Sequence, residues 1–199
     1  NYKGDENDLS IQPIKLQDMI DEGLYWREED PLASTEFTYS RFLTPHLNNY
    51  EGIAVFCDSD FLWQCDIREL LEHYDEKYSV MCVHHDYDPP EKTKMDGCIQ
   101  THYPRKNWSS MMVFNCSDIY CKNLSVENVN TKEAKYLHRM EWTDDNSIGY
   151  IPPTYNWLEG WYNSNINPKV IHYTRGGPWH ETWEGDYKEN WINVYNKLI

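Results

Sequence analysis

The sequence predicts one α/β domain built on a mostly parallel sheet flanked by helices. Short apolar runs alternate with helix-like stretches along all 199 residues, with no internal repeat or low-complexity segment between them. One apolar run, residues 53–57, has the length of a buried strand and ends directly in the acidic triplet Asp58-Ser59-Asp60. A chain of this length can form one sizeable core, so we predict a single domain over residues 1–199.

The predicted elements are separated by stretches rich in Gly, Pro, Asp and Asn. Strands are expected within residues 9–16 and at 52–57, 80–83, 111–114 and 169–173. Helices are expected from residue 34 or 35 to about 45, from Asp66 to about 74, after Ser125, after Thr131 and over 187–198. Asp66 and Glu69 form the capping-box pattern, which predicts that the helix of residues 66–74 begins at Asp66. The irregular stretch 86–106 is the candidate substrate loop.

The net charge of −15 argues against a nucleic-acid surface or an anionic membrane as partner, because both attract basic patches. The mean hydropathy is −0.83, and no apolar run approaches the roughly 20 residues of a spanning helix. The printed sequence also does not start with the basic and then apolar pattern of a signal segment. We therefore expect a cytoplasmic protein without a transmembrane segment.

The six cysteines show no CxxC spacing, and Cys57, Cys82 and Cys116 fall in or at the end of strand-like runs. We expect buried free thiols in a reducing compartment rather than disulfides. The nine tryptophans and 16 tyrosines have two possible roles. They fill the core, or some of them stack on sugar rings, and composition leaves both open.

The two aspartates of the triplet are candidates for a metal site. Side chains two positions apart on an extended segment point the same way, so Asp58 and Asp60 can reach one divalent ion. They also follow a strand, where ligands gather in open α/β sheets. The alternative is a solvated acidic turn, which is common in a chain with 33 acidic residues.

Two enzyme classes place aspartates at such a position. A phosphatase of the haloacid-dehalogenase type uses one as nucleophile, and Asp144-Asp145 would be its later acidic pair. The phosphatase pattern has Thr or Val at the position of Leu62, and it lies near the start of its domain, unlike the triplet of this chain. A nucleotide-sugar glycosyltransferase instead uses the triplet to hold Mn²⁺ or Mg²⁺ against a diphosphate.

Four further stretches, in this order, resemble glycosyltransferase family 8, which includes glycogenin and lipooligosaccharide galactosyltransferases. They are "STEFTYSRFLTPHL", "GIAVFCDSDFLWQCDIREL", "KNWSSMMVFNC" and "IHYTRGGPW", and they extend over residues 34–179. The resemblance implies a GT-A (Rossmann-like) fold and a nucleoside-diphosphate sugar donor, a UDP-sugar first. It also implies transfer of a hexose to a glycan or related hydroxyl acceptor with retention of configuration. A catalytically inactive carbohydrate-binding relative is the remaining alternative.

The resemblance assigns roles to residues of this chain. Asp58, Asp60 and His172 would bind the metal, Mn²⁺ or Mg²⁺. Asp144 would act at the sugar's β face, and Asp145 would orient it. The residues implied in donor binding are Tyr39, Arg41, Ser59, Ser109, Ser110, Asn115, Arg175, Gly176, Gly177 and Trp179. The glycines would admit a diphosphate, and Arg175 would supply a cation.

The sequence departs from the family at several positions and at its start. Gly177 stands where a lysine precedes Pro-Trp, Trp108 where an asparagine is common, and Asp144 where a glutamine is common. The match begins in the family's second strand, so the resemblance implies that the first strand-helix unit is missing. We then expect an open sheet edge beside the triplet and an incomplete base pocket.

Overall fold

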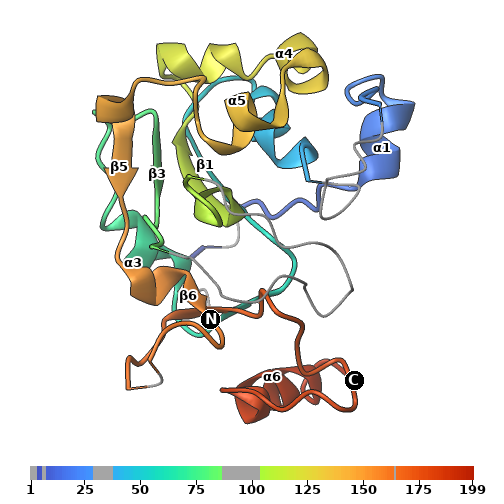
Figure 1. Ribbon diagram of the computed structural model, residues 1–199, viewed down its shortest axis with the longest axis vertical. Coiled ribbons are helices and arrows are strands. Elements are labelled where there is room, and N and C mark those ends of the chain that lie inside the picture. Colours follow the sequence, from blue (N-terminus) through green and yellow to red (C-terminus); the bar gives the residue numbers. More distant parts are fainter. Residues whose placement is uncertain (1–3, 6–7, 29–37, 87–103, 164) are drawn as a thin grey trace.

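A computed structural model describes residues 4–5, 8–28, 38–86, 104–163 and 165–199 (Figure 1). Its strands are β1 (Ile53–Cys57), β2 (Phe61–Trp63), β3 (Val80–Cys82), β4 (Met111–Asn115), β5 (Ile148–Tyr150), β6 (Trp157–Leu158) and β7 (Val170–His172). The α-helices are α1 (Leu16–Asp21), α2 (Thr44–Leu47), α3 (Ile67–Leu71), α4 (Val126–Thr131), α5 (Ala134–His138) and α6 (Lys188–Tyr195). Short 3-10 helices are η2 (Ser40–Leu43), η3 (Trp108–Ser110), η4 (Ile119–Asn123), η5 (Asp145–Ser147) and η6 (Pro153–Tyr155).

The strands form two sheets, one with the order β1-β4-β3-β5 and one with the order β2-β7-β6. The α/β class is confirmed, but the mostly parallel pairing is wrong for the described strands. β4 runs antiparallel to β1 and β3, and β7 runs antiparallel to β2, so three of the five pairings are antiparallel. The three residues between β1 and β2 are too few for a parallel crossover, so the chain changes sheet there.

Most of the strongly patterned elements are confirmed. β1, β3, β4, β7, α3 and α6 lie where the sequence predicts them. The Asp66 carboxylate accepts a hydrogen bond from the Arg68 N–H at 2.9 Å, and the Glu69 carboxylate accepts one from the Asp66 N–H at 3.4 Å. This is the predicted capping box, which satisfies two N–H groups that α3 leaves unpaired. The Ser125 hydroxyl caps α4 by accepting a hydrogen bond from the Asn128 N–H at 3.2 Å.

Two expectations differ from the structure. Residues 9–15 form no strand, because Pro13 lacks an N–H for a ladder and Ile11 is 84% exposed. Thr131 ends α4 instead of opening the next helix, and α5 begins after Glu133. The predicted helix start at 34 or 35 lies outside the described residues, as does most of the candidate substrate loop.

The larger sheet has a different neighbour on each face. Phe114 and Val80 face a core that includes Val129 of α4 and Leu137 of α5, which lie above the sheet in Figure 1. The alternate positions, such as Val113, face a second core with Leu70 of α3 and Val170 of the smaller sheet. The smaller sheet is therefore packed against the larger one, and their edges meet at the acidic triplet.

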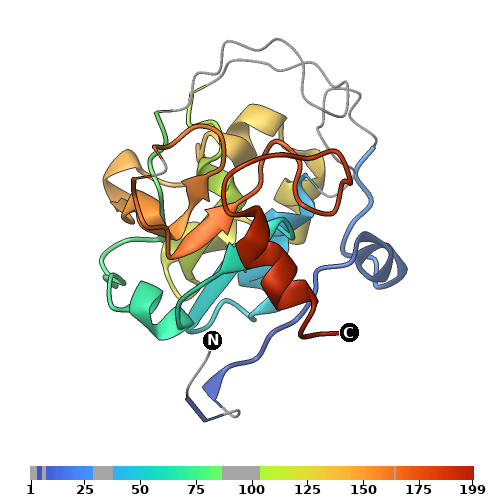
Figure 2. The same ribbon diagram turned by 90° about the horizontal axis from the view of Figure 1, so that it is seen from below.

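A third cluster joins the smaller sheet to the C-terminal helix. Trp157 and Tyr173 are fully buried there, and Trp191 of α6 packs against them. Figure 2 shows α6 in front of the strands, and Figure 1 places it at the opposite end from α4. Trp142, Trp157, Tyr155 and Tyr173 are thus core residues, whereas Trp26 and Trp179 are about half exposed. Among the described residues, no helix is both long and apolar enough to cross a membrane.

We expect Cys57, Cys116 and Cys121 to be unreactive in the folded protein. The five cysteines that the structure describes are free thiols. Burial raises the pKa of Cys57 and of Cys116 to about 11, and it raises the pKa of Cys121 as well. A raised pKa lowers the fraction of reactive thiolate at neutral pH. Maleimide labelling read by mass spectrometry should modify these residues slowly in buffer and fully in guanidinium. Rapid labelling of Cys121 in the folded protein would contradict the described packing.

Candidate metal centre

The sheet topology brings the carboxyl ends of β1, β3 and β5 to the same edge, where β4 begins. Asp58 follows β1, and its N–H donates to the Ser110 carbonyl at 2.9 Å, which extends the β1-β4 ladder by one step. Asp60 precedes β2, and its carbonyl accepts from the Tyr173 N–H at 3.0 Å, one residue beyond His172. The triplet therefore links the two sheets, and the end of β7 lies beside it.

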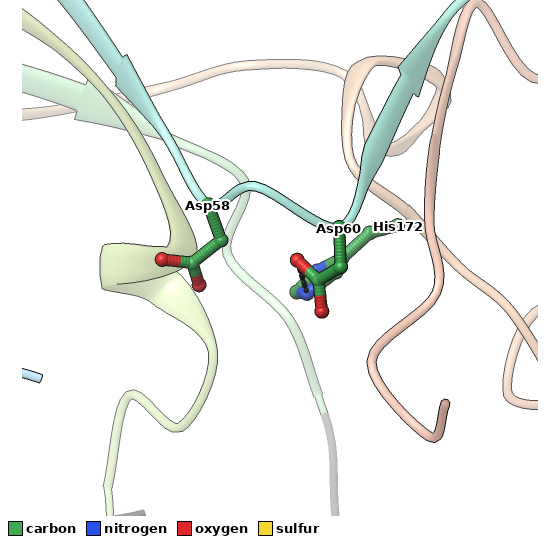
Figure 3. Close-up of side chains that lie close together, drawn as sticks. All are labelled: Asp58, Asp60 and His172. Carbon is green, nitrogen blue, oxygen red and sulfur yellow. Dashed lines mark ion pairs between the residues drawn. The ribbon is translucent and has the colours of Figure 1, made fainter. Parts of the chain in front are cut away.

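Asp58, Asp60 and His172 each offer a ligand atom, and these atoms lie within 4.8 Å of one another (Figure 3). Nε2 of His172 is 3.4 Å from Oδ1 of Asp60. Such a group of three occurs once in the part of the chain that the structure describes. The three residues assigned to the metal from the sequence thus come together from β1, β2 and β7.

The donor set fits a divalent cation. Oδ1 of Asp60 is buried and makes no hydrogen bond, which is costly for a carboxylate oxygen unless a cation compensates it. Two carboxylates with one imidazole are ligands that suit Mn²⁺, and the carboxylates alone suit Mg²⁺. A metal held here would contact Asp58, Asp60 and Nε2 of His172.

Arg41 already compensates Asp58. Its two terminal nitrogens lie 3.1 Å and 2.9 Å from the two carboxylate oxygens of Asp58. Burial raises the pKa of Asp58, and the attraction of Arg41 only partly opposes this. Burial also acts to raise the pKa of Asp60, but the attraction of His172 and its hydrogen bond, together with a backbone hydrogen bond and the charge of Arg41, bring that pKa below its usual value. Asp60 is thus the carboxylate held ionised without an arginine partner.

Several residues assigned to donor binding surround this cluster. Ser109 accepts a hydrogen bond from Arg41 through its carbonyl at 3.0 Å, and its hydroxyl lies 3.0 Å from Nδ1 of His138. Ser59 is exposed between the two aspartates. Tyr39 is 3% exposed, and the guanidinium of Arg27 covers its ring at 4.0 Å. Tyr39 therefore supports the η2 segment that carries Arg41 rather than facing solvent.

The loop after β7 carries the last group of assigned residues. Gly176 has φ of 96°, a conformation that favours glycine. A Cβ on Gly177 would lie 2.2 Å from the Trp179 ring, so this glycine lets the indole lie close over the backbone. Trp179 is 45% exposed, and Arg175 is exposed with one nitrogen 3.3 Å from the Gly160 carbonyl.

The structure does not bring three assigned residues to this centre. Asn115 ends β4 and pairs with Ile53 at the start of β1, so it lies at the opposite end of the sheet from Asp58. Asp144 and Asp145 are exposed and precede β5, whose amino end lies at that same opposite end. Asp144 caps η5, and Asp145 pairs with Arg105 at 2.6 Å. The antiparallel direction of β4 explains the wrong placement of Asn115.

Three residues near the centre were not assigned to it from the sequence. The Phe61 ring stacks on His172 with centroids 4.2 Å apart, and Asn156 lies 3.0 Å from Nδ1 of His172. His85, three residues after β3, is 6% exposed, and burial with repulsion from His172 lowers its pKa to about 3. Nothing in the sequence reveals that the Asn156 amide is fully buried.

Comparison with solved structures identifies the fold. The chain superimposes on the bifunctional glycosyltransferase WbbM with a TM-score of 0.57 at 19% identity, covering 81% of this chain and 35% of WbbM. It superimposes on the glycosyltransferase GlyE of Streptococcus pneumoniae TIGR4 at 0.56 and 14% identity, covering 84% and 45%. An active-site mutant of LgtC gives 0.51 at 14% identity, covering 85% and 70%. The chain thus spans about a third of WbbM and less than half of GlyE, and it has the GT-A glycosyltransferase fold.

Sequence comparison gives one close relative. No family model matches the sequence. The chain is 51% identical over 199 residues to Protein CDI of Arabidopsis thaliana, covering 95% of this chain and 76% of that protein. The chain therefore belongs to the family of Arabidopsis Protein CDI, and it carries the glycosyltransferase fold.

Proposed function

We propose that the protein is a metal-dependent, retaining glycosyltransferase of the family 8 type. It moves a hexose from a nucleoside-diphosphate sugar, a UDP-sugar first, to a glycan or related hydroxyl acceptor. The observation that carries the proposal is the meeting of Asp58, Asp60 and His172 within 4.8 Å, with a buried carboxylate oxygen among them that makes no hydrogen bond. The glycosyltransferase fold supports it.

The charge of the site explains why a cation is needed. The protein carries a net charge of −15, and two carboxylates lie where the diphosphate would approach, so the anionic donor would be repelled. When bound, Mn²⁺ or Mg²⁺ would neutralise the charge that develops on the leaving diphosphate. Arg41 holds the Asp58 carboxylate in place by a two-point contact.

The loop after β7 is the proposed binding position for the diphosphate of the donor. Gly176 leaves its backbone uncovered by a side chain, and Arg175 is an exposed cation three residues from His172. Asp144 and Asp145 have no role in the proposed reaction, because both lie outside the cluster. The cytoplasmic location expected from the free thiols is part of the same proposal.

The phosphatase alternative fits the geometry poorly. The second acidic pair, Asp144-Asp145, does not join the cluster. No observation therefore favours a phosphatase over a glycosyltransferase.

The test is donor hydrolysis. The protein is incubated with Mn²⁺ and a panel of UDP- and GDP-sugars, and the released nucleoside diphosphate is measured. We expect slow release from one donor, dependent on Mn²⁺ and lost with EDTA. Release from no donor, with the fold intact by circular dichroism, would instead support the inactive, carbohydrate-binding alternative.

A further inference from the structure

We propose that Ser110 and Asn156 form a buried relay of hydrogen bonds that holds His172 with Nε2 free to bind the metal. This inference rests on the proposed metal site. Ser110, Asn156 and His172 are 3%, 0% and 3% exposed, so water does not supply their hydrogen bonds. They come from the start of β4, the end of η6 and the end of β7, and thus connect the two sheets.

The direction of the relay follows from one fixed acceptor. The Ser110 hydroxyl lies 2.6 Å from the carbonyl oxygen of Asn107, which only accepts. Ser110 must therefore donate its single proton there. Its oxygen is then an acceptor for the Asn156 amide, 2.9 Å away, so the NH₂ group of Asn156 faces Ser110. The orientation of this amide is thereby set by the hydroxyl rather than chosen arbitrarily.

The orientation of the Asn156 amide determines which nitrogen of His172 carries the proton. With its NH₂ group turned to Ser110, Asn156 presents Oδ1 to Nδ1 of His172 at 3.0 Å. An amide oxygen only accepts, so Nδ1 carries the proton. In the neutral ring Nε2 then has a lone pair, and it lies 3.4 Å from Oδ1 of Asp60, which makes no hydrogen bond and pairs with the ring only when the ring is protonated. Two electron-rich atoms that face each other in a buried site favour a cation between them.

The ring is also fixed in plane. Phe61 is the ladder partner of His172 across β2 and β7, and its ring stacks on the imidazole at 4.2 Å with an angle of 22°. Strand register, stacking and the relay therefore leave His172 one orientation. Asn156 is a positioning residue, since it acts on the metal only through the histidine.

The experiment compares Asn156→Leu with Asn156→Asp by Mn²⁺ titration, followed by electron paramagnetic resonance of the free ion. Leucine removes the acceptor at similar size, and we expect Mn²⁺ affinity to fall about 10–100-fold, the usual cost of an outer partner. Aspartate keeps an acceptor oxygen towards Nδ1, and affinity should stay within a few fold. Asn130→Leu is the matched control, because Asn130 is buried with three hydrogen bonds outside the site. It should lower the melting temperature without changing Mn²⁺ affinity.

A second readout needs neither a variant nor activity. In ¹⁵N-labelled metal-free protein, at a pH where the ring is neutral, the His172 proton should be found on Nδ1. A proton on Nε2, or an Asn156→Leu protein that binds Mn²⁺ as tightly as the unmodified one, would overturn the relay. If the unmodified protein binds no Mn²⁺, the proposed metal-dependent function fails, and the position of the proton still decides the relay.

Discussion

Replacing Asp60 with asparagine is expected to abolish Mn²⁺-dependent donor hydrolysis while leaving the protein folded. Asparagine keeps the size of the side chain but removes its negative charge, and Oδ1 of Asp60 is the buried oxygen that makes no hydrogen bond. We expect turnover to fall about 100-fold or more, above the cost of losing an outer-shell partner. Mn²⁺ affinity should fall in parallel, measured by titration of the free ion.

The fold should tolerate this change. Asp60 lies in the link between two sheets rather than in a core cluster, and its loss removes both an attraction to His172 and a repulsion of Asp58. The melting temperature should therefore change little. Asp75→Asn is the matched control, because Asp75 is exposed and pairs with Lys77 away from the site. If Asp60→Asn kept full turnover with Mn²⁺, the metal role of the triplet would be wrong.

The location of the site was predictable because strand ends are visible in sequence. The apolar run 53–57 gives β1, and the triplet that follows it gives Asp58 and Asp60. His172 was assigned through its resemblance to a family motif, since no local pattern distinguishes a ligand histidine from one buried in the core. The capping box of α3 was also visible, because it depends only on residues three positions apart.

The direction of the strands was not predictable, and one error followed from it. Three-residue strands such as β2 and β5 show no periodicity, and pairing across sheets is a tertiary property. A parallel β4 would place Asn115 beside Asp58. The antiparallel β4 places η3 there instead, so Ser110 meets the site and Asn115 does not. The relay through Asn156 was hidden for the same reason, because it connects residues of both sheets.

Replacing Arg41 with methionine is expected to destabilise the protein more than any single change in the triplet. The side chains of Arg41 and Asp58 are only 11% and 25% exposed, so the change leaves a mostly buried carboxylate without its cation. We expect the free energy of unfolding to fall by roughly 2–4 kcal/mol, which is somewhat less than for a fully buried pair. For a chain of this size the melting temperature should fall by about 4–16 °C, measured by calorimetry.

The double variant Arg41→Met with Asp58→Asn separates charge from the other contacts of Arg41. Asparagine removes the uncompensated charge, so the double variant should be more stable than Arg41→Met alone. Recovery should be incomplete, because Arg41 also donates to the carbonyls of Thr38 at 2.9 Å and Ser109 at 3.0 Å. A double variant that is no more stable than the single one would show that these carbonyl contacts, rather than Asp58, account for the role of Arg41.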